Sequence, residues 1–549
     1  MQYLLPLAQF QAQLEANPDQ VWLHQPINQE FYTLTWREVD LQARRIAAGL
    51  KAQGFVAGDR IALLSKNCAE WFVSDIAIMM AGMVSVPIYS TAGVKTISHV
   101  LSHSGSKAIF VGKLDSLDAA NEAIPKGVLK IAYPYPSCNA DVQWSDWLST
   151  YQVMPVADVA EHIPDDLMTI AYTSGSTGLP KGVALTYRNI GSSSSCSAKA
   201  FDSKPGDRLM SYLPLAHITE RGVVEWMSVY GGVEIAFVES LDTFIADVRY
   251  ARPSGFISVP RLWTKFQSQI LAKMPDRKLQ RLLKIPIVGK MVAKKIREGL
   301  GLDKCRTFGS GSAPISPEIL RWYERIGIEI SEGWGMTETS GLSCSTIPFD
   351  TRFVGSIGKP IDCVKMKLSD EGEVLIGGDA VFTYYYNNPE ATAEAIVDGW
   401  FHTGDRGTID ENGCYNIVGR VKEQFKTSKG KYVAPVPIES MLARNSIIEQ
   451  VCVLGSGRKQ PLAIAVLNEQ NQEFNDEVHQ GLIRTLKEVN SELESHQRLD
   501  HLVVCTDFWT IENELLTPTL KIKRNKLEER YGSYLHKVLD GDVIWEAGT

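Results

Sequence analysis

The residues best suited to chemistry are concentrated in a glycine- and hydroxyl-rich loop. An apolar run beginning at Leu167 leads into Thr173-Ser174-Gly175-Ser176-Thr177-Gly178, and Pro180-Lys181-Gly182 follows. Glycines let backbone N–H groups approach phosphate oxygens closely, hydroxyls add donors, and a lysine adds positive charge. The Gly-Lys-[Ser/Thr] order of a Walker A loop is absent. The segment predicts a phosphate-binding loop of another kind, with a serine- and glycine-rich surface loop as the alternative.

Four further blocks follow this loop: GWGMTETSG (333–341), GWFHTGD (399–405), GRVKEQFK (419–426) and LTPTLKIKR (516–524). In content and order, the five blocks resemble the adenylate-forming enzymes. That family includes acyl-CoA synthetases, coumarate ligases, firefly luciferase and peptide-synthetase adenylation domains. The segments YLPLAHITER (212–221), VPRLWTKF (259–266) and KTSKGKYVAP (426–435) are most similar to long-chain fatty acyl-CoA synthetases. The resemblance covers nearly the whole chain.

The resemblance implies a ligase that activates a medium- or long-chain fatty acid. ATP would give acyl-AMP and pyrophosphate, and CoA would then take the acyl group and release AMP; Mg²⁺ is the implied cofactor. A fatty carboxylate is already ionised at pH 7 and needs no general base. Its difficulty is that an anion must approach a polyanion, so the site must supply positive charge and oriented donors.

The resemblance also implies a set of ligands for ATP or AMP. This set is Thr173, Ser174, Gly175, Ser176, Thr177, Gly178, Lys181, Gly311, Ser312, Glu332, Gly333, Trp334, Gly335, Thr337, Asp405, Arg420, Lys422, Lys426 and Lys521. Thr173 and Glu338 would ligate Mg²⁺, a hard ion that prefers oxygen ligands. Trp334, where most relatives have tyrosine, would stack on the adenine, and Asp405 would accept hydrogen bonds from the ribose. By itself, Trp334 is better interpreted as a core aromatic, and its neighbours favour the functional interpretation.

Lys181, His217 and Lys521 would be the catalytic residues. Taken alone, His217 is compatible with a structural histidine and Lys521 with a solvated basic run, and the surrounding blocks favour the functional interpretation. The acyl pocket would be formed by His217, Trp226, Tyr230 and Gly231, and the CoA tunnel would pass Gly430. Two departures stand out: Lys429 occupies a position where glycine is usual, and Thr219 one where long-chain relatives often carry an aromatic residue.

Two other functions share these motifs. A fatty acyl-AMP ligase would have the same nucleotide residues but deliver the acyl group to a carrier protein, and Lys429 gives it slight encouragement. A catalytically silent relative would serve as a nucleotide-binding or scaffolding protein. The intact residues Lys181, Glu338, Asp405 and Lys521 argue against that second alternative.

These residues need a scaffold of alternating strands and helices. Strand-like runs at 60–65, 84–89 and 108–111 alternate with helical patterns at 36–53 and 96–102, which predicts parallel sheets covered by helices. From about Val364, short strands joined by turns containing glycine predict a barrel-like antiparallel unit. The expected fold is α/β: a large N-terminal domain (1–419) of two α/β subdomains and a small β-barrel-like subdomain, and a small mobile α+β C-terminal domain (420–549). By resemblance, Lys422 would be the pivot between them.

Composition limits the classes of protein. The 549 residues include 44% hydrophobic and 22% charged residues with a net charge of −8, which excludes a disordered chain and argues against nucleic-acid binding by the chain as a whole. Nine cysteines without a CxxC pair, and no signal-peptide pattern at the N-terminus, predict a cytoplasmic protein. Ile76–Tyr89 is too short to span a bilayer and is expected to be a buried helix end that leads into a strand. A homodimer is compatible with the sequence.

One segment is locally basic. Residues 273–297 contain nine Lys and Arg residues against the single acidic residue Asp276, with Leu, Ile and Val interleaved. A solvated helix face is the simpler interpretation of this pattern, and an amphipathic surface helix near anionic lipid headgroups is the functional one. The functional interpretation predicts peripheral contact with the inner face of a membrane.

Overall fold

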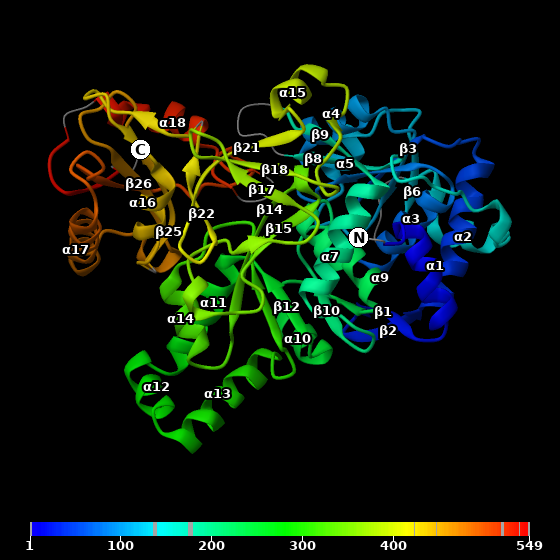
Figure 1. The fold of residues 1–549 in the computed structure, drawn as a ribbon, viewed down its shortest axis with the longest axis horizontal. Coiled ribbons are helices and arrows are strands. Elements are labelled where there is room, and N and C mark those ends of the chain that lie inside the picture. Colours follow the sequence, from blue (N-terminus) through cyan, green and yellow to red (C-terminus); the bar gives the residue numbers. More distant parts are fainter. Residues whose placement is uncertain are drawn as a thin grey trace. The chain divides into compact units, whose positions relative to one another are not determined.

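Figure 1 shows the computed structural model, which describes residues 3–135, 140–173, 179–421, 423–445, 447–517, 521–536 and 539–546. The described chain packs into two compact units. The first holds the residues up to Thr173 and those of Leu179–Met366 and Ile376–Phe401; the second holds those of Lys367–Leu375 and from His402 onward. The domain boundary predicted at 419/420 marks the place where the chain would pivot. Packing alone does not locate a pivot, so this boundary stays a prediction.

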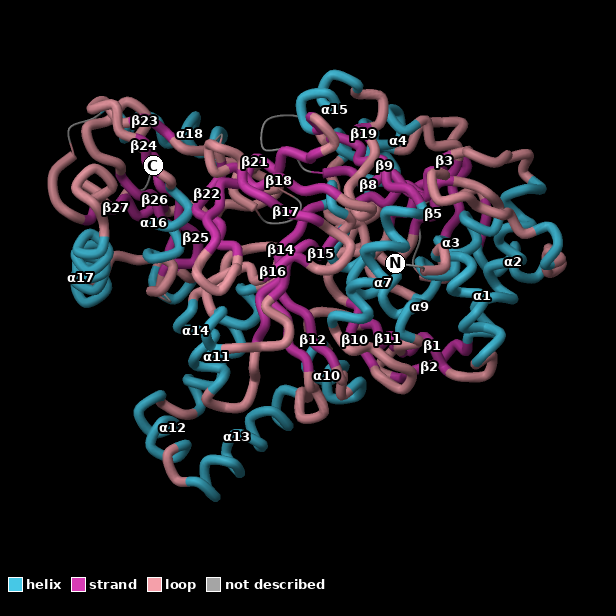
Figure 2. Tube along the Cα trace, in the orientation of Figure 1, coloured by secondary structure: helices cyan, strands magenta, loops and turns pink. Residues whose placement is uncertain are grey.

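The largest sheet of the first unit carries Thr173 and Lys181, which lie on either side of the predicted phosphate loop in the sequence (Figure 2). In spatial order its strands are β19 (Tyr384–Tyr385), β9 (Lys181–Thr186), β8 (Leu167–Thr173), β4 (Val84–Ile88), β3 (Arg60–Leu64), β5 (Ala108–Val111), β6 (Leu129–Ala132) and β7 (Val142–Gln143). From β8 to β7 the pairing is parallel, whereas β9 and β19 are antiparallel additions at one edge. The strands predicted at 60–65, 84–89 and 108–111 are confirmed.

Helices of the first unit follow the predicted alternation. The first seven are α1 (Pro6–Ala16), α2 (Trp36–Ala52), α3 (Ala69–Met80), α4 (Val94–Ser104), α5 (Asp118–Ala123), α6 (Trp144–Thr150) and α7 (Tyr187–Ala200). A capping box between Thr35 and Glu38 starts α2, because each side chain accepts the backbone N–H of the other residue. Every residue of α3 is buried, and the helix ends just before β4, as expected for the apolar stretch at Ile76–Tyr89.

Two smaller sheets complete the first unit. One has the order β10 (Arg208–Ser211), β11 (Glu234–Phe237), β1 (Val21–Ile27) and β2 (Glu30–Thr35). The other has the order β12 (Gly255–Ser258), β13 (Thr307–Ser310), β14 (Ile330–Met336), β15 (Gly341–Ser345) and β16 (Lys359–Pro360). Strands β12 to β14 are parallel, and β15 and β16 continue antiparallel.

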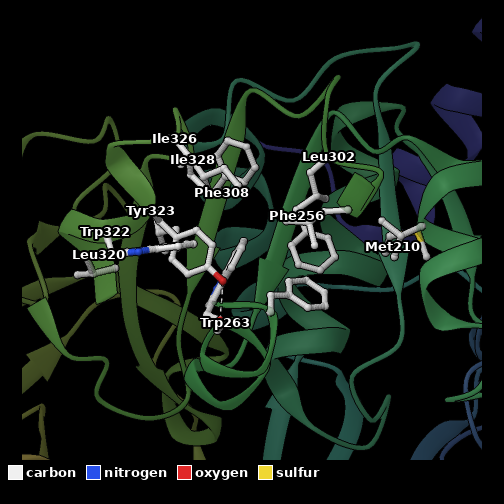
Figure 3. Packing of buried hydrophobic residues seen from close by; sticks show 14 of the residues in the cluster. Met210, Phe256, Trp263, Leu302, Phe308, Leu320, Trp322, Tyr323, Ile326 and Ile328 are labelled. Carbon is white, nitrogen blue, oxygen red and sulfur yellow. Dashed lines mark hydrogen bonds between the residues drawn. The ribbon is translucent and has the colours of Figure 1, made fainter. Parts of the chain in front are cut away.

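The remaining helices of this unit are α8 (Ile218–Glu220), the π-helix η2 (Arg221–Trp226), α9 (Met227–Gly231), α10 (Phe244–Ala251), α11 (Pro260–Lys273), α12 (Asp276–Leu283), α13 (Pro286–Leu300), α14 (Pro317–Glu324) and α15 (Pro389–Ala395). An aromatic cluster joins α11 and α14 to the β12–β14 strands (Figure 3). At its centre, Trp263 donates its indole N–H to the Gly309 carbonyl at 3.2 Å and accepts a hydrogen bond from the Tyr323 hydroxyl on its own carbonyl. These polar anchors fix the strands that carry the candidate site.

A further sheet is built largely from the segment after Val364. Its order is β17 (Lys365–Leu368), β18 (Glu373–Gly377), β21 (Trp400–Ile409) and β20 (Ile396–Val397), and β22 (Tyr415–Arg420) pairs with β21. The short strands and turns predicted there are confirmed: Ser369 and Gly372 close the turn after β17, and Asp410 and Gly413 close the turn after β21.

The second unit contains a sheet of β25 (Ile448–Leu454), β26 (Leu462–Leu467), β27 (Leu502–Cys505) and β28 (Val543–Trp545). Its other elements are the hairpin of β23 (Phe425–Lys426) and β24 (Tyr432–Val433), and the helices α16 (Pro435–Leu442), α17 (Asp476–Glu492) and α18 (Arg524–His536). The mixed α/β fold with a large and a small unit is therefore confirmed. In the described part of the chain, no helix is long and apolar enough to cross a membrane.

Candidate active site

Strand pairing holds the two ends of the predicted phosphate loop together. In the antiparallel pair of β8 and β9, Thr173 lies opposite Lys181 and Tyr172 opposite Gly182. The Thr173 hydroxyl donates to the Lys181 carbonyl at 3.5 Å. The residues predicted to bind phosphate between them, Ser174–Gly178, lie outside the described residues. The hairpin therefore places Thr173 and Lys181, two of the predicted ligands, side by side at the base of that loop.

Tyr385 connects Lys181 to Glu338. The Lys181 ammonium nitrogen lies 5.1 Å from the centroid of the Tyr385 ring, a cation–π distance. The Tyr385 hydroxyl donates to Glu338 Oε1 at 2.8 Å, and each of these two residues is only 8% exposed. Because the acceptor is a buried carboxylate, this hydrogen bond is of the strong, charge-assisted kind. The structure thus brings together two predicted site residues through a tyrosine that the motifs did not indicate.

The position of Tyr385 depends on an edge strand far away in the sequence. In β19, Tyr385 pairs with Val183 of β9, and the Tyr386 N–H donates to the Gly182 carbonyl at 2.7 Å. The available sequence signal was the run Tyr384-Tyr385-Tyr386, since aromatic residues favour strands. Nothing in that run specifies its pairing with a strand two hundred residues earlier.

Strand β14 carries the predicted adenine-binding segment into the site. Its pairing with β15 shifts register between Trp334 and Gly335. A Cβ atom at Gly335 would lie 1.6 Å from the Gly341 carbonyl oxygen, so only glycine fits there. After the shift, a short 3₁₀ turn at Thr337–Thr339 is fixed by a hydrogen bond of 3.1 Å from the Met336 N–H to the Thr339 hydroxyl. This turn positions Thr337 and the buried Glu338.

A small cavity lies between the ends of β13 and β14 and the segment around α8 and η2. Its volume is about 40 Å³. It is lined by Phe201, Thr219, Val223, Ile257, Gly309, Ser310, Gly311, Ser312, Ser331, Gly333, Trp334, Gly335, Gly341, Leu342, Ser345 and Ile347. Five predicted nucleotide ligands, at 311, 312 and 333–335, are therefore brought together here. Val223 begins the segment 223–237 that was expected to line the acyl pocket, whereas Phe201 and Ile257 join the lining without having been predicted, because each comes from a different segment with no motif.

Two polar residues near the cavity, Ser312 after β13 and Glu332 on β14, are held in fixed positions. Ser312 has a left-handed backbone conformation with φ of 66°, and its hydroxyl lies 3.4 Å from the Thr219 hydroxyl. Nearby, burial raises the pKa of the Glu332 carboxyl to about 8. The Glu332 carboxylate accepts the Gly355 N–H at 2.8 Å, so its side chain is bound to the protein, whereas the next residue, Gly333, lines the cavity.

His217 caps the short helix α8. Its Nδ1 accepts a hydrogen bond from the Thr219 N–H at 3.2 Å, so the ring proton of the neutral imidazole is on Nε2. His217 itself does not line the cavity, although Thr219 does. Of the other residues predicted for the acyl pocket, Trp226 is buried in η2, and Tyr230 donates its hydroxyl to the Leu4 carbonyl at 2.6 Å.

Gly231, the fourth residue predicted for the acyl pocket, packs against another segment. A Cβ atom there would lie 2.7 Å from the Cβ atom of Ser203. The structure therefore brings neither Trp226, Tyr230 nor Gly231 to the cavity lining. Their assignment to the acyl pocket stays a prediction that this conformation does not support by contact.

A buried charge cluster fixes the segment that follows His217. Arg221 donates to both carboxylate oxygens of Asp75, at 2.8 and 2.6 Å, and to the Ser85 hydroxyl at 3.1 Å. Glu220 accepts hydrogen bonds from the Asn67 amide and the Tyr212 N–H, each at 3.1 Å. Asn67, Asp75, Ser85, Glu220 and Arg221 are each at most 7% exposed. The network therefore anchors α8 and η2 from within the protein.

In the second unit, Asp405 and Arg420 form an ion pair. They lie opposite each other on β21 and β22, and the Arg420 guanidinium is 3.0 Å from Asp405 Oδ1. The same guanidinium donates to the Thr403 carbonyl at 2.9 Å. Asp405 has an 11% exposed side chain and Arg420 a 43% exposed one, so the carboxylate is held and the cation partly faces solvent. Two residues predicted to contact the ribose are thus neighbours.

Lys426 and Gly430 lie on one small hairpin. The Lys426 ammonium is 5.5 Å from the centroid of the Tyr432 ring. Gly430 has a positive φ of 77°, and a Cβ atom there would lie 3.8 Å from the Lys426 Cε atom. The left-handed turn favours glycine at that position. Lys422, the predicted pivot, lies outside the described residues.

Lys521 is exposed at the end of a closed loop. Its N–H donates to the Thr517 hydroxyl at 3.0 Å, and the Thr517 N–H donates to the Lys521 carbonyl at 2.8 Å. A bridge between Leu516 and Ile522 closes the base of this loop. The loop therefore presents Lys521 from a fixed backbone position.

No cluster of three or more His, Cys, Asp or Glu side chains able to hold a metal ion occurs in the part of the chain that the structure describes. An ion at this site would therefore rely on a few oxygen ligands together with those of a substrate, which is the usual arrangement for Mg²⁺ with nucleotides.

The chain is similar in sequence to known proteins over most of its length. The pattern of the "AMP-binding enzyme" family matches residues 10–386, and that of the "AMP-binding enzyme C-terminal domain" matches residues 422–541. A fatty acyl-CoA synthetase A of Dictyostelium discoideum is 31% identical, over 91% of this chain and 85% of that protein. A long-chain-fatty-acid–CoA ligase of Mycobacterium bovis is 30% identical over 95% of both chains.

The fold agrees with a solved structure as well. The A domain of a carboxylic acid reductase from Segniliparus rugosus, in complex with AMP and a co-purified carboxylic acid, superposes with a TM-score of 0.80. The two chains are 24% identical, and the superposition covers 97% of this chain and 93% of that one. At this identity the likeness establishes the fold.

Proposed function

This chain belongs to the AMP-binding enzyme family, and from that premise we propose that it is a fatty acid–CoA ligase of the AMP-forming type. Its substrates are a medium- or long-chain fatty acid, ATP and CoA. The observation that carries the proposal is the connected set Lys181, Tyr385 and Glu338 at the base of the predicted phosphate loop. Similarity over nearly the full length to long-chain-fatty-acid–CoA ligases supports the choice of substrate.

In the first half-reaction, the fatty carboxylate attacks the α-phosphorus of ATP and pyrophosphate leaves. Lys181 and the loop that follows Thr173 stabilise the negative charge on the leaving phosphates, and Thr337 contacts the α-phosphate. No base is required, because the carboxylate is already ionised. Catalysis at this step depends on donors that are held in place before the charge develops. The pairing of β8 with β9 fixes Thr173 and Lys181 next to each other in this way.

Mg²⁺ fits the residues present. The Tyr385 hydroxyl donates to Glu338 Oε1 and holds this carboxylate in position, and Thr173 offers a hydroxyl at the base of the same loop. When bound, the ion would screen the phosphates of ATP. Within the protein, Tyr385 orients the Glu338 carboxylate, and Lys181 adds a fixed positive charge beside it.

Ribose and adenine are recognised by residues of different kinds. Asp405 accepts hydrogen bonds from the ribose hydroxyls, and Arg420, paired with it at 3.0 Å, holds the Asp405 carboxylate in position. Trp334 stacks on the adenine, with Gly311, Ser312 and Glu332 adjacent in the same segment of the fold. Lys426 makes a further contact with the nucleotide.

Lys521 acts in the adenylation step, where it stabilises the charge that passes from the carboxylate to the α-phosphate. It belongs to the second unit, and the division of the chain into two units supports a cycle in which that unit changes position between the half-reactions. Lys422 is the proposed pivot, and the proposed boundary between the two domains lies between residues 419 and 420. In the second half-reaction the CoA thiol, passing Gly430, attacks the acyl carbonyl and AMP leaves.

The cavity beside Trp334 is too small in this conformation for an acyl chain. Pockets for drug-sized ligands occupy roughly 300–1,000 Å³, whereas this cavity occupies about 40 Å³. Its apolar walls at Phe201, Val223 and Ile257 must therefore separate to admit an alkyl chain. We assign these three residues to the start of the acyl pocket, beside the Thr219 position, and keep His217 next to the carboxylate.

A panel of fatty acids from short to very long chains tests the proposal. Pyrophosphate release and AMP formation are measured with and without CoA, and with a phosphopantetheinylated carrier protein. We expect turnover that depends on both a fatty acid and CoA. Transfer to carrier protein but not to CoA would favour the acyl-AMP ligase. Absence of pyrophosphate release with every acid would leave only nucleotide binding and refute the ligase.

Two finer expectations accompany this function. A fatty acid substrate partitions into membranes, so a cytoplasmic enzyme that contacts a membrane surface peripherally through residues 273–297 would meet its substrate there. A homodimer is the second expectation, and sedimentation analysis of the purified chain tests it.

A further inference from the structure

The basic segment forms two helices that are anchored on one side only. Leu279 of α12 and Ala293 of α13 are buried against the aromatic cluster of the first unit. The Trp322 indole donates to Asp276 at 3.0 Å, and Arg297 donates to the Ile326 carbonyl at 2.6 Å. In Figures 1 and 2, α12 and α13 extend beyond the β12–β13 strands of their unit. Most of the other residues in 273–297 are exposed.

The turn between α12 and α13 exposes apolar side chains. Ile285 is 49% exposed, Ile287 76%, Val288 37% and Met291 57%. Elsewhere among the described residues, no ten-residue stretch exposes more than two large apolar side chains. Gly289 permits the close turn, because a Cβ atom there would lie 2.5 Å from the Leu283 carbonyl oxygen. We name the segment from Lys284 to Met291 the α12–α13 tip.

Positive charge surrounds the tip. Of the nine Lys and Arg residues between 273 and 297, eight are exposed, including Lys284 and Lys290 within the tip and Lys295 one turn further along α13. The one acidic residue in this range, Asp276, accepts the Trp322 indole at the anchored side. The whole chain carries a net charge of −8, so this cationic surface is a local feature.

We propose that the α12–α13 tip is a docking surface for anionic membranes. The apolar side chains insert into the interface between headgroups and acyl chains, and the surrounding lysines contact the anionic headgroups. Both parts are needed, since partitioning at an interface combines buried apolar area with attraction between the basic residues and anionic lipid. The proposal rests on this surface alone and does not depend on the proposed reaction.

The chemistry of the tip favours lipid over other polyanions. Binding to a nucleic acid backbone requires cations, but it gives no reason to expose Ile287 and Met291 to water. A second copy of this chain would bring the same eight exposed cations against themselves, which is unfavourable in a two-fold contact. An anionic bilayer satisfies the charge and the apolar side chains together.

Docking at the tip also has a structural connection to the candidate cavity. The helices α11 to α13 form the crossover between the neighbouring parallel strands β12 and β13. Ile257 of β12 and Gly309 of β13 both line the cavity. The tip that would contact the membrane is therefore part of the connection between two strands that line the cavity.

Cosedimentation of the full chain with vesicles tests the proposal. The vesicles contain phosphatidylcholine either alone or with about one third phosphatidylglycerol, at low and high salt. We expect binding to the anionic vesicles that weakens with salt, because surface electrostatics are screened. The variant I287S/M291S should reduce partitioning about tenfold or more. The variant K284Q/K290Q/K295Q should reduce it by a similar factor and abolish the preference for anionic lipid.

Matched controls alter the same chemistry elsewhere on the first unit. L241S/V156S removes two exposed apolar side chains, which are 90% and 66% exposed, and K95Q/K126Q removes two exposed cations. Both controls should bind like the parent protein. Acyl-dependent AMP formation with a soluble medium-chain acid, measured without vesicles, should be unchanged in all variants and shows that each is folded.

Three results would overturn the proposal. One is wild-type binding that is absent, or equal on neutral and anionic vesicles. Another is tip variants that bind as well as their controls. The third is evidence for another occupant. Binding to duplex DNA that the lysine variant loses equally would identify a nucleic acid. A dimer in light scattering that the I287S/M291S variant no longer forms would identify a second copy of the chain.

Discussion

Replacing Tyr385 with phenylalanine tests the centre of the candidate site. The change removes the hydroxyl that donates to Glu338 at 2.8 Å and leaves the ring 5.1 Å from the Lys181 ammonium. A hydrogen bond to a charged group contributes about 1.5–3 kcal/mol, and Glu338 is only 8% exposed, so little water can replace the lost donor. We expect adenylation at limiting Mg²⁺ to fall about 10- to 150-fold.

The assay is acyl-dependent pyrophosphate release, titrated with Mg²⁺ at saturating ATP and fatty acid. If Tyr385 orients Glu338, the variant's midpoint in Mg²⁺ rises, whereas a purely structural loss lowers the rate at all Mg²⁺ concentrations alike. Tyr384→Phe is the matched control, because this neighbouring side chain is 38% exposed. A double-mutant cycle with Glu338→Gln completes the test: additive effects would refute the coupling between the two side chains.

Three further predictions follow from the described contacts. Lys521→Ala should lower pyrophosphate release a hundredfold or more yet leave thioester formation from added acyl-AMP nearly unchanged, with Lys523→Ala as the control; equal losses in both steps would contradict the role. Asp405→Asn should raise the KM for ATP and erase discrimination against 2′-deoxy-ATP, whereas unchanged discrimination would place the ribose elsewhere. Burial raises the pKa of Glu220 to about 8 from 4.5, so the folded protein retains a proton that the unfolded chain releases, and stability falls as pH rises from about 4.5 to about 8. Glu220→Gln should flatten that decline in urea midpoints measured at pH 5 and pH 8.5, and an unchanged slope would argue that another group carries it.

Much of the fold was predictable because its signals are local. The strands at 60–64, 84–88 and 108–111 and the helices at 36–52 and 94–104 follow from runs of apolar residues and their spacing. The turn at Asp410–Gly413 was indicated by asparagine and glycine, which accept the backbone conformation of tight turns. In each case the residues that specify the element are the ones that form it.

The site was predictable only in part. The loop after Thr173 and the Trp334 segment were identified from motifs, and the structure places Gly311, Ser312 and Trp334 around one cavity. The acyl wall at Phe201 and Ile257 was not identified, because single apolar residues in separate segments carry no signal of their common destination. The family resemblance likewise placed Tyr230 in the acyl pocket, whereas its hydroxyl donates to the Leu4 carbonyl.

The sequence by itself indicated which chemistry this protein can support. Its signals were the glycine- and hydroxyl-rich loop, the five sequence blocks in their fixed order, and the basic segment at 273–297. Only the tertiary structure decided which side chains meet. The pairing of β19 with β9 places Tyr385 between Lys181 and Glu338, and the anchoring of Leu279 turns Ile287 toward solvent. Local composition sets what a residue can do, but its partners depend on strand register and helix packing across hundreds of residues, which no local pattern specifies.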